Sequence, residues 1–213
     1  MGKLGERLQK IFCNPWFDKL IAVVLVGYSV SMAISINGER RGLPLVLLLV
    51  RVIVLNGLVL IRRHPQRITV SPLFWIVAMA EAYWDLLFGV FRSYPSVALC
   101  PAWFTDGLSI MAFLILLTAR ISLGRSFGIV AADRGIITTG AYRIVRHPVY
   151  TAAYLAVFAY VLSHFSVLTV SLALCNFALT ATKALLEEKF LGLNEAYKRY
   201  MGRVRYRFFP LIA

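Results

Sequence analysis

Six apolar segments constrain the fold of this chain more than any other feature. A helix needs about 20 predominantly apolar residues to cross roughly 30 Å of hydrocarbon. Segments of this kind cover residues 20–36, 43–61, 73–91, 103–119, 149–163 and 165–182. The fifth is short for a full span, so we expect the last two to form a close helical hairpin, tilted or partly recessed, with its turn on the far side of the membrane. The pattern predicts an all-α, polytopic integral membrane protein with about six transmembrane helices.

The composition supports this fold class and excludes others. Hydrophobic residues make up 60% of the 213 residues and charged residues 15%, against roughly 25% charged residues in soluble domains. A soluble globular chain and a disordered chain are therefore excluded. The three cysteines are far apart and form no CxxC pair, so we expect neither a disulfide framework nor a metal site. They are Cys13, Cys100 and Cys175.

The distribution of positive charge predicts the orientation in the membrane. Eighteen of the 23 Lys and Arg residues lie in the N-terminal tail, the second and fourth connections and the C-terminal tail. The opposite face carries only Arg40, Arg41 and Arg92. By the positive-inside rule, both termini face the cytoplasm. The net charge of +13 is then a topology signal that also suits anionic lipid head groups, and we expect no nucleic-acid partner.

Charged residues inside the apolar segments are a second notable feature. Arg51 lies in the second segment, and Glu81 and Asp85 share one face of the third at i, i+4 spacing. Unpaired charges are costly in hydrocarbon. Two interpretations stay open: an ion pair between Arg51 and Glu81 that links two helices, or a polar wall of a substrate cavity.

A polar, basic and glycine-punctuated stretch precedes the fifth segment. It contains Arg146-His147-Pro148-Val149-Tyr150, and proline is favoured in the first turn of a helix. We therefore expect His147 at a helix N-terminus, among free backbone N–H groups that favour an anion. Tyr150 lies one turn away and is expected to share a pocket with it.

The end of the sixth segment returns to the same membrane face. Lys183 and Glu187 have i, i+4 spacing, and Glu188 follows. From spacing alone, an interfacial ion pair with a basic anchor is the simpler interpretation. The aromatic and basic tail from Tyr197 to Pro210 is typical of a membrane-surface anchor.

Taken together, the motifs of the second half resemble the isoprenylcysteine carboxyl methyltransferase family. They occur in the family's order over about residues 120–210, and they are also similar to integral-membrane phospholipid methyltransferases. The chain looks like a prokaryotic member, which implies the inner (cytoplasmic) membrane. The matching motifs are Ser122–Phe127, Arg134–Gly140, Tyr142, Arg146–Tyr150, Glu187-Glu188 with Leu191, and the tail from Tyr197 and Tyr200 to Pro210.

The resemblance implies a cytosolic site for S-adenosyl-L-methionine, enclosed by the last hairpin and the tail and open laterally to lipid. Lys183 and Glu187 are the implied catalytic residues, although the family usually has an arginine where Lys183 stands. The positions that match cofactor contacts are Arg134, Gly135, Ile136, Ile137, Tyr142, His147, Pro148, Val149, Tyr150 and Glu187.

The expected chemistry is methyl transfer from S-adenosylmethionine to a membrane-embedded, lipid-linked acceptor. Methyl transfer from a sulfonium mainly requires alignment of donor and acceptor and exclusion of water. The acceptor is either a prenylcysteine-like carboxylate or a lipid head-group amine, and the cations near Lys183 favour an anionic one. Two alternatives stay open: a membrane sterol or enone reductase that uses NADPH, and a non-enzymatic membrane scaffold or transport component.

We expect one membrane domain with two functional parts. Residues 1–119 would form four transmembrane helices that select the substrate, and residues 120–213 would hold the methyltransferase motifs. The partners are then the bilayer and a lipid or lipidated substrate, while the sequence predicts no oligomeric state.

Overall fold

The computed structural model describes residues 65–91, 93–128 and 130–210, together with residue 63 and scattered residues between 7 and 27. The second predicted span, which contains Arg51, and most of the first lie outside the described residues, as does the side chain of Asp85. The predicted pair between Arg51 and Glu81 is therefore not described.

Helices make up most of the described residues. The helices are α4 (Pro72–Tyr83), α5 (Asp85–Val90), α6 (Ala102–Leu123), α7 (Pro148–Ser163), α8 (Val167–Leu191) and α9 (Glu195–Arg203). Two 3-10 turns, η1 (Gly124–Ser126) and η2 (Gly140–Arg143), follow α6 and precede α7. The described sheet has two short antiparallel strands, β1 (Arg67–Ile68) and β2 (Ala132–Asp133).

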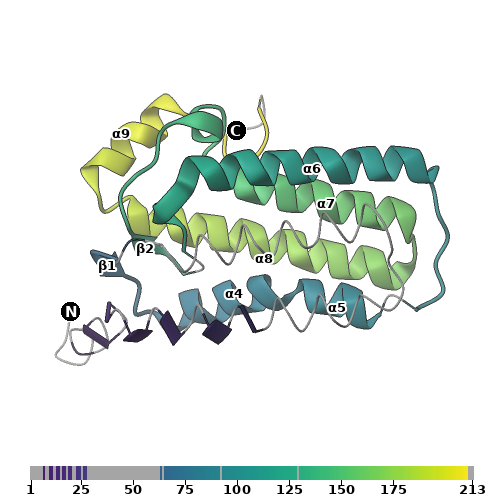
Figure 1. The fold of residues 1–213 in the computed structure, drawn as a ribbon, viewed down its shortest axis with the longest axis horizontal. Helices are drawn as coiled ribbons and strands as arrows, with labels where there is room; N and C mark the ends of the chain where they lie inside the picture. Colours follow the sequence, from purple (N-terminus) through teal and green to yellow (C-terminus); the bar gives the residue numbers. More distant parts are fainter. Residues whose placement is uncertain are drawn as a thin grey trace.

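The long helices lie side by side along the longest axis of the molecule (Figure 1). Three described stretches are long and apolar enough to cross a membrane: Pro72–Val90, Ala102–Ser126 and Val167–Leu191. Helix α7 is apolar but shorter. The prediction of a mostly helical membrane protein is confirmed for this part of the chain, whereas the total of six spans and the closing hairpin stay predictions.

The starts of three helices follow from their local sequence. Proline at the first position of α7 has a fixed φ that suits a helix and no N–H to leave unsatisfied. Ser166 caps α8, where its hydroxyl accepts from the amide of Thr169 at 3.1 Å. Asn194 caps α9 in the same way through the amide of Ala196, at 2.9 Å. Pro148 and these two caps fix where α7, α8 and α9 begin.

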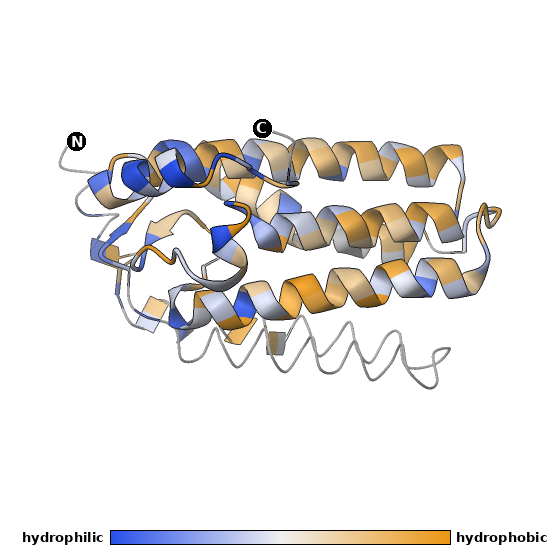
Figure 2. Ribbon diagram, turned by 90° about the horizontal axis from the view of Figure 1, so that it is seen from above, coloured by the Kyte–Doolittle hydropathy of each residue, from blue (hydrophilic) through white to orange (hydrophobic). Residues whose placement is uncertain are grey.

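Small side chains let the helices approach one another closely. Ala119 and Ala184 are completely buried, and Ala152 and Ala159 nearly so. Large apolar side chains instead lie on the outer faces: Trp103 is 75% exposed and Val167 86%. Figure 2 shows apolar residues along most of the length of the long helices, with hydrophilic residues gathered towards one end. Small residues inside and large apolar residues outside is the arrangement expected of helices packed in lipid.

Candidate active site

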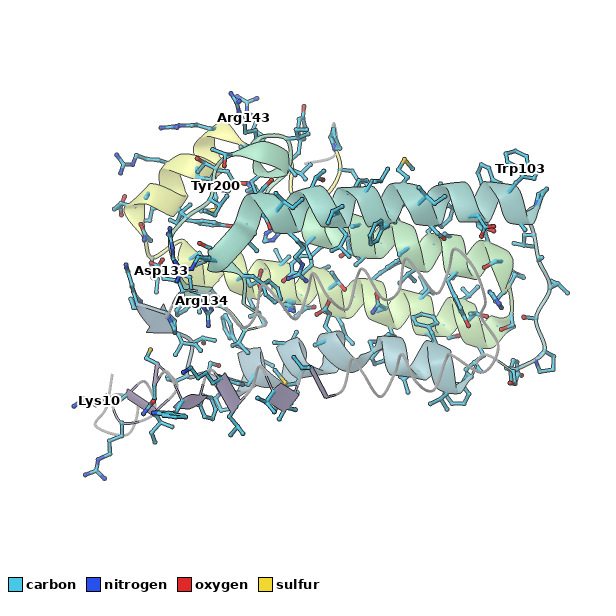
Figure 3. All side chains as sticks on the ribbon, in the orientation of Figure 1. Lys10, Trp103, Asp133, Arg134, Arg143 and Tyr200 are labelled. Carbon is cyan, nitrogen blue, oxygen red and sulfur yellow. The ribbon has the colours of Figure 1, made fainter. Side chains whose placement is uncertain are left out.

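The polar residues gather where α6 ends, α7 begins and α8 ends; we call this the polar end. Figure 3 shows Asp133, Arg134, Arg143 and Tyr200 there, with Trp103 at the opposite end of the bundle. Helix α9 and the two-stranded sheet lie at the polar end as well (Figure 1). The residues predicted to carry the chemistry therefore share one end of the molecule.

Glu188 is the centre of a buried ion-pair cluster at the polar end. Its Oε1 atom accepts from Arg146 Nε at 2.8 Å and lies 3.1 Å from His147 Nε2. Its Oε2 atom accepts from Nε and Nη2 of Arg207, at 3.1 and 3.0 Å. The side chain of Glu188 is only 9% exposed. The anion beside Arg146 and His147 is thus a carboxylate of the chain itself.

His147 precedes the first residue of α7, as predicted, and its side chain is buried. The ring of Tyr150 stacks on its imidazole, with centroids 5.2 Å apart and planes 12° apart. The expectation of free amides around it needs correction, because the amides of Tyr150 and Thr151 both donate to the His147 carbonyl at 3.0 Å. The imidazole Nδ1 atom lies 3.9 Å from Oε2 of Glu187.

Lys183 forms an ion pair with a residue on another helix. Its Nζ donates to Oε2 of Glu81 on α4 at 2.7 Å, and both side chains are mostly buried. The same Nζ atom lies 5.5 Å from the centre of the Tyr150 ring. Glu81 is therefore paired, and its described partner is Lys183. This pair links α4 and α8 close to His147 and Glu187.

The C-terminal tail, residues 204–210, lies across the start of α7. The amide of His147 donates to the carbonyl of Arg207 at 2.9 Å, and the preceding amide donates to the carbonyl of Tyr206 at the same distance. The hydroxyl of Thr151 donates to the carbonyl of Phe208. Backbone hydrogen bonds and the pair between Arg207 and Glu188 thus fasten the tail to the polar end.

An apolar group adjoins the ion-pair cluster. Tyr142 packs with Tyr197 and Tyr200, and the hydroxyl of Tyr200 donates to the Tyr142 carbonyl at 2.8 Å. Burial raises the pKa of Tyr142, and the nearby Arg120 guanidinium opposes this shift, so the phenol is neutral at physiological pH. Three further predicted cofactor residues pack against the same group: Ile136, Ile137 and Val149.

The loop before the apolar group around Tyr142 holds the remaining predicted cofactor residues, Arg134 and Gly135. Nε of Arg134 donates to the carbonyl of Arg63 at 3.0 Å, and a Cβ on Gly128 would lie 2.5 Å from Arg134 Nη1. Gly135 has a φ of 95°, which favours glycine, and its amide donates to Asp133 at 3.2 Å. These contacts direct the Arg134 guanidinium towards the loop backbone.

The structure thus brings His147, Pro148, Tyr150, Lys183 and Glu187 together, next to the apolar group. The partners of Glu188 and the pairing of Lys183 with Glu81 were not predicted from the sequence. A usable signal was present, since two consecutive carboxylates at the end of an apolar helix need cations to compensate them.

Comparison with known proteins gives a family match for the second half of the chain. No curated protein matches it significantly. Residues 96–199, just under half of the chain, match the model of the phospholipid methyltransferase family. The match extends from the segment before α6 into α9 and includes Tyr142, His147, Lys183 and Glu187. By sequence, this part of the chain is similar to a family of methyltransferases that act on membrane lipids.

Proposed function

We propose that this chain transfers a methyl group from S-adenosylmethionine to the head group of a membrane lipid or lipid-linked acceptor. The match of residues 96–199 to the phospholipid methyltransferase family carries this proposal. The location of the ion-pair cluster supports it, because a reaction at the polar end of apolar helices has access to lipid head groups.

The residues at the polar end suit the chemistry of this cofactor. S-adenosylmethionine supplies an electrophilic methyl group, together with an adenine ring, a ribose and an amino-acid end. Ile136, Ile137, Tyr142 and Val149 offer an apolar surface for a flat ring. His147 and Glu187 offer polar atoms beside it. The protein has to align donor and acceptor and exclude water, and the tail over α7 contributes to that exclusion.

The charge at Lys183 bears on the choice of acceptor. A free cation would favour a carboxylate acceptor, such as a prenylcysteine. Glu81 compensates Lys183 at 2.7 Å, and Glu187 adds a second carboxylate one turn away. Because Glu81 compensates its charge, Lys183 offers no free cation to a carboxylate acceptor. We propose a phospholipid amine as the acceptor, in place of the anionic one expected from the sequence.

We further propose that both termini face the cytoplasm of a prokaryotic cell and that the polar end lies at the inner face of the inner membrane. Six spans and a closing hairpin of α7 and α8 complete this topology. A reporter that works only in the cytoplasm should then be active when it is fused after Pro210. Activity of a periplasm-dependent reporter at that position would contradict the orientation.

A methyl-transfer assay tests the function directly. Purified protein, S-adenosylmethionine with a labelled methyl group and vesicles of phosphatidylethanolamine should give labelled lipid. Vesicles of phosphatidylglycerol and a prenylcysteine analogue are the comparison acceptors. Lys183→Met should lower turnover by at least about tenfold by disturbing the pair with Glu81. Lys198→Met, which removes an exposed pair with Glu195, is the matched control and should not.

Three outcomes of this assay and of direct binding would count against the proposal. Label in the prenylcysteine analogue alone would overturn the choice of acceptor. No binding of S-adenosylhomocysteine would refute the cofactor assignment. Binding of NADPH in its place would favour the reductase.

A further inference from the structure

The cations of the polar end fall into two sets with different surroundings. Some belong to buried ion pairs: Arg146 and Arg207 compensate Glu188. Lys183 compensates Glu81 in the same way. A second set lies outside these buried pairs, on helix α9, on the turn η2 and at the start of the tail. Its side chains are all exposed, and we call them the basic face: Arg143, Lys198, Arg199, Arg203 and Arg205.

Helix α9 has two unlike faces. On its inner face, Tyr197 and Tyr200 are buried and pack with Tyr142. Arg199 and Arg203, one helical turn apart, are exposed. The same short helix therefore covers the apolar group around Tyr142 with one side and presents positive charge on the other.

Hydrogen bonds hold the neighbouring cations next to α9. The hydroxyl of Tyr200 donates to the carbonyl of Tyr142 at 2.8 Å, and Arg143 is the next residue of η2. The amide of Val204 donates to the carbonyl of Tyr200 at 3.0 Å, and Arg205 follows directly. Figure 3 shows Arg143 near Tyr200 at the polar end. The members of the basic face thus lie on one part of the surface.

The basic face has little negative charge around it. Within residues 130–210, Glu195 is the only exposed acidic residue, and it pairs with Lys198 at 2.6 Å. Five cations and this one acid give a net charge of +4. Like charges gathered on one surface repel each other, and an anionic partner relieves that repulsion. The surface therefore fits a partner that offers several negative charges.

Exposed apolar side chains beside these cations favour a lipid surface over a soluble polyanion. Ile144, next to Arg143, is 59% exposed, and Leu193, just before α9, is 62% exposed. A mixture of basic and apolar side chains suits the head-group region, where cations meet phosphates and apolar groups reach the acyl chains. Figure 1 shows α9 at the ends of α6 and α8, the level at which a bilayer crossed by these helices has its head groups.

We propose that the basic face binds anionic phospholipid head groups, and that the bound lipid holds α9 against the apolar group around Tyr142. The ligand class is a phospholipid with a net negative charge and no amine, such as phosphatidylglycerol, so it is bound but not methylated. This site lies outside the one proposed for the methyl acceptor. It requires neither cofactor nor acceptor, and it therefore goes beyond the proposed function.

Lipid cross-linking tests which head group binds. Phosphatidylglycerol and phosphatidylcholine, each with the same photoreactive acyl chain, are compared on the full-length protein in vesicles. Cross-links to residues 193–205 should be enriched with phosphatidylglycerol. The double variant Arg199→Gln with Arg203→Gln should lower this enrichment at least about fivefold, since one arginine near an anionic surface is worth roughly that factor. Salt at about 1 M should also abolish it, because the Debye length is then only about 3 Å.

A second double variant controls for the loss of charge. Lys10→Gln with Lys19→Gln also removes two exposed cations. Figure 3 shows Lys10 on the other side of the helix bundle from Arg143. This control should keep the enrichment at residues 193–205.

Hydrogen exchange tests the effect of the lipid on α9. Amides of residues 198–203 should exchange at least about fivefold more slowly in vesicles that contain phosphatidylglycerol than in phosphatidylcholine alone, because a ligand that binds the docked helix stabilises it. The variant of Arg199 and Arg203 should lose this difference, and the lysine control should keep it. Both measurements are made without cofactor, so a failure of methyl transfer does not alter their result.

Equal cross-linking of the two lipids to residues 193–205 would overturn the lipid site. Exchange in α9 that is the same with and without phosphatidylglycerol would overturn the effect on the helix. A short RNA added to protein in phosphatidylcholine vesicles tests the other class of partner. Its binding through Arg199 and Arg203, without enrichment of phosphatidylglycerol, would replace the lipid with a soluble polyanion and refute the proposal.

Discussion

The pair between Lys183 and Glu81 leads to a stability prediction whose magnitude follows from the structure. Both side chains are largely buried, at 9% and 15% exposure, and they join α4 to α8. Removal of one partner from a buried pair leaves an uncompensated charge, which costs about 3–5 kcal/mol in a fully buried site. Because both groups keep some contact with the surface, we expect Lys183→Met to cost about 3 kcal/mol.

Glu81→Gln should cost less than Lys183→Met. The charge that it leaves behind belongs to Lys183, which is attracted by Glu187 one turn along α8. Lys183→Met removes the cation from Glu81, which lies on another helix. We therefore expect about 1–2 kcal/mol for Glu81→Gln, and a double variant that is more stable than Lys183→Met alone.

Thermal unfolding in detergent measures these differences. For a chain of this size, 1 kcal/mol corresponds to about 2–4 °C in Tm, so Lys183→Met should lower Tm by about 6–12 °C. Lys198→Met, which breaks the exposed pair with Glu195, should change it by less than about 2 °C. A double variant that is no more stable than Lys183→Met would refute the pairing as the cause.

Three further predictions concern the tail, the start of η2 and the buried phenols. Arg207→Met should release the tail from Glu188 and speed chymotryptic cleavage after Tyr206 and Phe208 by at least about fivefold, whereas Arg205→Met, at an exposed arginine, should not; equal rates would contradict the attachment of the tail through Arg207. Gly140→Ala should destabilise the fold by about 1–3 kcal/mol in chemical unfolding, because its φ is 60° and the new Cβ would clash with Ser122 Oγ. Stability should fall as the pH rises above about 10, because burial raises the pKa of Tyr142 and its phenol ionises first in the unfolded chain; a flat stability profile to pH 11 would contradict this.

Much of the described fold could be predicted from local sequence. Apolar length predicted the helices at 103–119 and 149–163 to within a few residues, and Pro148 marked the start of α7. The segment 73–91 was predicted as one helix, whereas the structure divides it at Trp84 into α4 and α5. The sixth segment was predicted to end near residue 182, but α8 continues to Leu191. Its last turns carry Lys183, which pairs with Glu81, and Glu188, which pairs with Arg146 and Arg207; these partners all lie outside the helix.

The candidate site was predictable only where its members are close in sequence. The contact between His147 and Tyr150 follows from one helical turn, and it was predicted. The partners of Glu188 and Lys183 were not, because Arg146 and Glu81 lie 42 and 102 residues away along the chain. Such pairs depend on which helices pack together, and spacing within one segment carries no information about that.

The length of α7 has a consequence for the lipid around it. Its 16 residues span about 24 Å, against roughly 30 Å of hydrocarbon, whereas the 22 residues of α6 span about 33 Å. A bilayer adjusts to such hydrophobic mismatch by thinning locally. If α7 runs across the membrane, head groups beside it sit deeper than elsewhere, at the level of His147. A lipid could then bring its polar group to the ion-pair cluster while its acyl chains stay in the bilayer, with no need to be lifted out of the membrane.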